Sequence, residues 1–133
     1  MKVLLIFILT SLLLSCNKDD YHTGISMYGS GQVGIRETNI PDTVTIFDQV
    51  QISAKAEAIN GCWSDLYFNF NESGEFEYSL EAYGKYTNLN GVCPDIMVYK
   101  DTMINFQPTQ KGKYFFNVSR FKDSIIVDTM IVK

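Results

Sequence analysis

The sequence has little histidine and no excess of basic residues, and both shortages exclude functions. Its single histidine, His22, stands in a polar segment near the N-terminus, so a Ser/His/Asp or Cys/His catalytic arrangement inside a folded domain is excluded. The formal net charge is -4, from 11 basic and 15 acidic residues. Because an acidic chain lacks the positive field that attracts phosphate backbones, we expect no nucleic-acid partner.

The sequence also lacks a long apolar run. Its one sustained run, from Val3 to Leu14, is shorter than the roughly 20 residues that cross a bilayer as a helix. Lys2 precedes the run. A charged start followed by an apolar stretch of this length is typical of a signal peptide.

A cysteine follows this apolar run. Leu13, the small Ser15 and Cys16 form the sequence LLSC, which resembles the lipobox of bacterial lipoproteins. The resemblance implies a signal peptide over residues 1–15, lipidation of Cys16 with palmitate-type acyl chains, and a membrane anchor. The alternative is an ordinary secretory signal with an incidental cysteine.

The polar residues Asn17 to Asp20 (NKDD) come directly after this cysteine. They resemble the surface-export signal of Bacteroidota-type lipoproteins. That resemblance implies an outer-membrane protein anchored at the cell surface, with the periplasm-facing leaflet as the alternative.

Two cysteines remain once Cys16 is lipidated. Cys62 and Cys93 are an even number in an oxidising compartment, so we predict a disulfide between them. It would close a loop of about 30 residues and stabilise the fold by roughly 3–4 kcal/mol. Two free thiols or a metal site are the alternatives, but a metal site would need two more soft ligands.

Residues 16–34 are predicted to form the lipidated cysteine and a flexible tether, because Asn17 to Gly34 is polar and glycine-rich. Within this segment, Gly29 to Gly34 (GSGQVG) matches the dinucleotide-binding pattern G-x-G-x-x-G. No apolar strand precedes the match, and Pro41 stands where a phosphate-binding helix would begin. We therefore expect these residues to form either a linker or an irregular first strand.

After Pro41 the apolar residues recur with a period of two, which predicts β-strands. In EFEYSLEA (Glu75 to Ala82) apolar and polar residues alternate, and Asn71 to Gly74 supplies turn residues for a hairpin. The predicted strand-like runs are Thr43–Phe47, Gln49–Ile59, Leu66–Phe70, Phe76–Ala82, Ile96–Phe106, Lys113–Phe121 and Ser124–Val132. The fold class is therefore all-β, with about seven short strands.

One motif narrows this class. Phe106 to Val118 (FQPTQKGKYFFNV) places Pro and Gly ahead of Tyr114. It resembles the corner of immunoglobulin-like domains, where a tyrosine hydroxyl bonds back to the preceding loop. The resemblance implies an immunoglobulin-like antiparallel β-sandwich over residues 35–133. Phe116 occupies the position of the second cysteine in antibody domains, so the likeness is to the broad sandwich class, as in small surface lipoproteins of the Bacteroidota type.

The sequence offers candidates for ligand binding rather than catalysis. Carboxylates such as Glu75, Glu77 and Glu81 alternate with apolar residues, which is typical of a solvated sheet face. We therefore predict no enzyme activity, no catalytic residue, no metal and no cofactor. If Leu66 and its alternate neighbours point inward, Trp63, Tyr67 and Tyr83 share the opposite face, where they could stack on a glycan or a peptide. The alternative is that Trp63 covers the disulfide.

A further pattern, Asp followed by Ser or Thr and then an apolar residue, occurs four times. It resembles the O-glycosylation sequon of exported Bacteroidota-type proteins. The implied sites are Thr43, Thr102, Ser124 and Thr129.

Together these features predict a non-enzymatic lipoprotein that displays a small binding or adhesion module at the cell envelope. Its partners would be the membrane, through the lipid anchor, and a glycan or an envelope protein. One alternative is a structural subunit of an envelope complex, paired through an open edge such as Ser124–Val132. Another is a protease inhibitor acting through the loops near the disulfide.

Overall fold

The computed structural model describes residues 27–121 and 123–133, and these residues form eight strands and no helix. The predictions for residues 1–26, including lipidation of Cys16, lie outside the described residues. The strands are β1 (Met27–Asn39), β2 (Thr43–Val44), β3 (Val50–Ala58), β4 (Trp63–Gly74), β5 (Glu77–Asn88), β6 (Val98–Phe106), β7 (Gly112–Ser119) and β8 (Ile125–Val132). The all-β class predicted from the sequence is confirmed.

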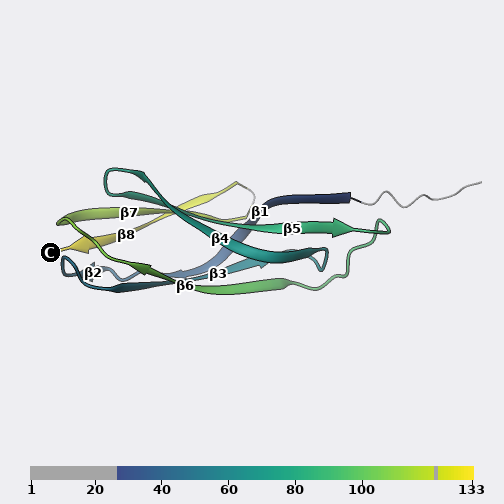
Figure 1. Cartoon of the computed structure of the whole chain (residues 1–133), viewed down its shortest axis with the longest axis horizontal. Coiled ribbons are helices and arrows are strands. Elements are labelled where there is room, and N and C mark those ends of the chain that lie inside the picture. The colour runs from purple at the N-terminus through teal and green to yellow at the C-terminus, as the bar shows by residue number, and fades with distance from the viewer. Residues whose placement is uncertain (1–26, 122) are drawn as a thin grey trace, which may run out of the picture.

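All eight strands belong to one sheet, in the order β2-β8-β7-β5-β1-β3-β6, with β4 on the other side of β5. The sheet curls into two layers, and Figure 1 shows β1 crossing from one layer to the other. The first half of β1 pairs with β5, from Met27↔Asn88 to Val33↔Ala82. The second half pairs with β3, from Gly34↔Glu57 to Asn39↔Ser53. One strand therefore supplies an edge to each layer.

Most strand pairs are antiparallel, but β5 pairs with β7 and β2 pairs with β8 in parallel. The immunoglobulin-like sandwich is built of antiparallel sheets. The immunoglobulin-like sandwich therefore remains a prediction. The predicted hydrogen bond from Tyr114 back to the preceding loop is confirmed. The Tyr114 hydroxyl donates to the carbonyl of Gln110 at 3.0 Å and accepts from the Gln110 amide at 3.3 Å.

The core lies between the two layers in two neighbouring clusters. The first is built on small residues of β3, such as Ala54 and Ala56, which face Leu80 and Val118. The second is largely aromatic: Phe116 is fully buried, and Phe106 and Tyr78 pack around it with ring centroids 5.0–5.8 Å apart. Small side chains of β3 thus pack against larger facing residues in the first cluster, and aromatic rings fill the second.

Two side chains that follow β7, those of Arg120 and Phe121, hold β1 in place where it crosses between the layers. The register shifts between Ile35 and Glu37, and the guanidinium of Arg120 donates to the carbonyls of Ile35 and Arg36 at this point. Phe121 covers Gly34 so closely that a Cβ there would lie 2.6–2.8 Å from its ring. The backbone carbonyls freed by the bulge are thus paired, and only glycine fits beneath the ring.

Two sequence predictions, one about β1 and one about the turn between β4 and β5, are wrong. Residues 27–34, predicted as tether, lie in β1, so of the two alternatives for Gly29 to Gly34 the strand is observed. The predicted turn at Asn71–Gly74 lies inside β4, and the turn residues are Glu75 and Phe76, with Phe76 at φ 60°. Phe76 packs edge-on against Tyr114 at 5.0 Å, so contact with the aromatic cluster favours a turn three residues later than predicted.

We expect Gly34→Ala to lower the free energy of unfolding by about 1–3 kcal/mol, because the added methyl group overpacks the site against Phe121. Gly29→Ala is the matched control in the same strand, since a Cβ at Gly29 meets no atom within 4 Å. Urea denaturation of both variants would measure the difference. Equal stabilities would contradict the close packing at the crossing.

Candidate functional site

The three aromatic residues predicted to share a ligand-stacking face are divided between the two faces of the sheet. Trp63 is half-buried and packs against the core, over glycines of β1 and β5. A Cβ at Gly31 or Gly84 would lie 3.1 or 3.2 Å from its indole ring. The prediction that Trp63 lies opposite the inward residues of β4 is therefore wrong.

A bulge explains the error. The pairing of β4 with β5 shifts between Ser64 and Tyr67, and Asp65 has a left-handed backbone with φ 49°. An extra residue in a strand resets its alternation, so Trp63 and Leu66 both point inward. The indole stands edge-on to Tyr86, 5.3 Å away, and the Tyr86 hydroxyl lies 3.3 Å from Cys93 Sγ.

Tyr67 and Tyr83 do meet on the outer face of β4 and β5. Their rings stack with centroids 5.7 Å apart, and Tyr67 is 52% exposed. The Tyr83 hydroxyl donates to Glu81 at 3.0 Å, and this hydrogen bond raises the pKa of Tyr83 because ionisation would break it. The pair is a flat, exposed platform on the sheet.

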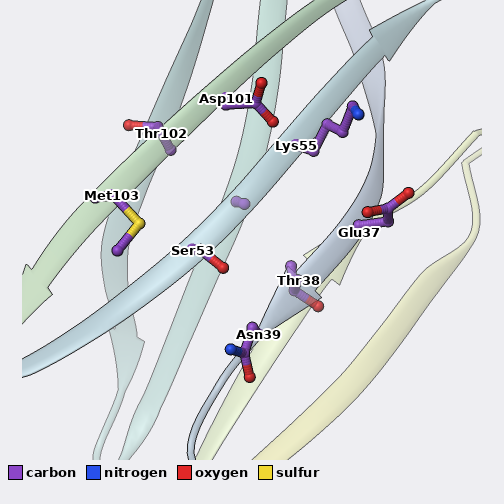
Figure 2. A pocket seen from close by; sticks show the side chains of 9 residues that line it. Glu37, Thr38, Asn39, Ser53, Lys55, Asp101, Thr102 and Met103 are labelled. Atoms are coloured by element: carbon purple, nitrogen blue, oxygen red, sulfur yellow. The ribbon is translucent and has the colours of Figure 1, made fainter.

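A shallow, open depression lies on the outer face of the other layer. It has a volume of about 410 Å³ and crosses β1, β3 and β6. Its lining residues are Glu37, Thr38, Asn39, Ser53, Ala54, Lys55, Asp101, Thr102 and Met103. We call this depression the polar hollow. Figure 2 shows Lys55 on the central strand, with Glu37 on one side and Asp101 on the other.

Strand register arranges these groups in rows. Lys55 pairs with Glu37 on β1 and with Asp101 on β6, so a cation stands between two carboxylates. The next row holds Asn39, Ser53 and Met103. The hollow therefore presents hydrogen-bond donors and acceptors side by side, although apolar atoms, the exposed thioether of Met103 among them, make up most of its accessible lining.

A charged pair and an aromatic ring border the hollow. Arg36 and Glu57 form a 2.5 Å ion pair, and the Glu57 side chain is only 8% exposed. This hydrogen bond to Glu57 raises the pKa of Arg36, which stays charged. The ammonium of Lys55 lies 5.0 Å from the centroid of the Tyr99 ring, a cation–π contact that orients the lysine along β6.

The predicted disulfide between Cys62 and Cys93 is confirmed, with a Cα–Cα distance of 5.2 Å. It ties the β3–β4 turn to the long connection between β5 and β6. Backbone hydrogen bonds reinforce the tie, since Gly61 donates to the carbonyl of Pro94 at 2.8 Å and Thr87 donates to that of Cys62 at 2.8 Å.

The four predicted glycosylation sites differ in exposure. Thr43 and Ser124 are exposed, whereas Thr102 and Thr129 are half-buried. Thr102 lies at the wall of the polar hollow, and Ser124 bonds through its hydroxyl to the carbonyl of Phe121 at 2.9 Å. Modification at these residues stays a prediction, with Thr43 and Ser124 the more accessible pair.

Within residues 27–121 and 123–133, no three His, Cys, Asp or Glu side chains are grouped so that they could hold a metal ion. The same part of the chain contains no helix of the length and apolarity needed to span a membrane. Comparisons with protein-family models, curated proteins and solved structures find no match to this chain.

The sequence analysis missed the polar hollow altogether. The one feature of the sequence that points to the hollow is the alternation in β3, where polar residues such as Ser53 and Lys55 stand between buried alanines. Those residues indicate a solvated face, but the groups opposite them come from segments about 15 and 50 residues away in the sequence. Only the pairing of β1 and β6 with β3 brings them together.

We expect Trp63→Ala to lower the free energy of unfolding by about 3 kcal/mol, because it removes a large ring from the inner face of the sheet. Tyr67→Ala, on the outer face, should change stability by less than about 1 kcal/mol. Chemical denaturation followed by circular dichroism would compare them. A larger loss for Tyr67→Ala would contradict the assigned faces.

Proposed function

We propose that this chain is a non-enzymatic, membrane-anchored lipoprotein whose β domain captures a polar ligand at the cell envelope. The resemblance of Leu13–Cys16 to a lipobox supports the anchor. The disulfide between Cys62 and Cys93 supports a location outside the cytoplasm, because such bonds persist in oxidising compartments.

The polar hollow is the observation that carries the binding function. Its size suits one or two sugar rings or a similarly small polar group, and its lining alternates carboxylate, ammonium, amide and hydroxyl groups. Sugar rings offer hydroxyls that both donate and accept hydrogen bonds, and apolar C–H faces that suit Met103. We therefore propose a short oligosaccharide segment as the ligand.

The arrangement of the carboxylates supports binding rather than hydrolysis. Glu37 and Asp101 lie on strands separated by β3, so their backbones are about 10 Å apart. Lys55 occupies the row between the two carboxylates, whereas the carboxyl pair of a glycosidase flanks the sugar itself.

A glycan array probed with the oxidised protein tests this function. We expect binding to a defined set of oligosaccharides, and about a tenfold loss for Lys55→Ala, because a hydrogen bond from a charged donor is worth about 1.5 kcal/mol or more. Lys111→Ala is the matched control, since Lys111 is exposed and lies outside the lining of the hollow. Binding that is absent, or equal in the Lys55 and Lys111 variants, would contradict the proposal.

A second candidate function, assembly with a partner chain, rests on the edge of β8. On its outer side β8 pairs with β2 only at Ile131 and Val132. Ile125, Ile126 and Val127 are 46–64% exposed on the remaining edge. An apolar edge of this kind can accept a strand from another protein. A stoichiometric protein partner recovered from native envelopes would favour assembly, whereas a co-purifying glycan favours capture.

A further inference from the structure

The end of the domain at which β1 begins carries a group of exposed apolar side chains. We call this group the apolar tip. Its members are Met27, Tyr28, Val92 and Ile96, each at least 57% exposed. Exposed apolar groups gathered at one place mark contacts with another protein or with a membrane.

The two segments that form the tip, the start of β1 and the connection between β5 and β6, are both fixed to the rest of the domain. Met27 pairs with Asn88 at the end of β5, and the disulfide joins the turn after Ile59 to the loop that carries Val92 and Ile96. Ile96 lies over Gly61, where a Cβ would come within 2.9 Å of its side chain. The apolar groups are therefore held on a stapled end of the domain.

The chain itself indicates what covers this tip. The apolar run ends at Leu14, Cys16 follows, and eleven residues later Met27 opens β1 at the tip. At a maximum of roughly 3.5 Å per residue, this connection spans at most about 40 Å. In Figure 1 the start of β1, the end of β5 and the connection to β6 lie at the end opposite the C-terminus. The end that a membrane anchor holds nearest to the lipid is thus the apolar one.

Charge does not favour a strongly anionic or cationic partner there. The connection from Leu89 to Met97 contains Asp95 as its one charged residue. Exposed isoleucine, valine and methionine side chains offer apolar surface that the boundary between headgroups and acyl chains can bury, and tyrosine is enriched at that boundary.

We propose that the apolar tip inserts into the interface of the lipid bilayer, so that the domain stands on the membrane by two contacts, its lipid anchor and its stapled loops. This inference rests on the proposed membrane anchoring. Insertion fixes the orientation of the domain, and the polar hollow, which extends to the last residue of β1, lies farther from the lipid than the tip does.

Tryptophan quenching by brominated lipids tests the proposal on the acylated full chain in phosphatidylcholine vesicles. Val92→Trp places a probe at the tip, and Phe47→Trp places the matched probe at the opposite end. Both sites tolerate the change because the two side chains are 77% and 60% exposed. The wild-type chain, with Trp63 alone, gives the background.

We expect bromine on the acyl chains to quench the Val92→Trp probe at least about twofold more than the Phe47→Trp probe, because interfacial insertion reaches about 5–10 Å. Equal quenching in two variants that both float with the vesicles would overturn the tip insertion and leave the anchor in place. If neither variant floats with the vesicles, the anchor fails and the insertion fails with it.

Discussion

The continuity of β1 is the constraint on which the two-layered arrangement depends. A single strand pairs with β5 over Met27–Val33 and with β3 over Gly34–Asn39, and it has to change layers between them. Such a change frees backbone carbonyls, which is costly in a partly buried position. The guanidinium of Arg120 donates hydrogen bonds to the carbonyls of Ile35 and Arg36, and the ring of Phe121 covers Gly34. The two residues that follow β7 thus fix the course of the first strand.

The same strand relates the two proposed functional surfaces. Its first residues, Met27 and Tyr28, belong to the apolar tip, and its last ones, Glu37 to Asn39, line the polar hollow. Because β1 is continuous, the distance between the tip and the hollow is set by strand geometry. A domain that rests on lipid through one end would therefore hold its ligand-binding face at a fixed height above the membrane.

The sequence predicted those features that depend on neighbouring residues. The alternation in Glu75–Ala82 predicted a strand with Tyr78 and Leu80 facing the core. The resemblance of Phe106–Val118 to a tyrosine corner predicted that the Tyr114 hydroxyl bonds back to the preceding loop. Cysteine parity predicted the disulfide. Each of these follows from local periodicity, turn chemistry or simple counting.

Features that depend on distant pairing could not be predicted in this way. The glycines of Gly29 to Gly34 lower strand propensity, and only the partners β5 and β3 make this segment a strand. Trp63 changed faces because of a bulge at Asp65 that no alternation pattern contains. The polar hollow combines three segments whose register is set by the whole sheet.

Amide hydrogen exchange along β1 tests most directly whether this strand couples the two layers. If it does, the amides of Val33 and Ile35 exchange only through global unfolding, and both halves of the strand lose protection together as denaturant is added. Exchange of residues 34–39 at low denaturant, while residues 27–33 remain protected, would contradict the account.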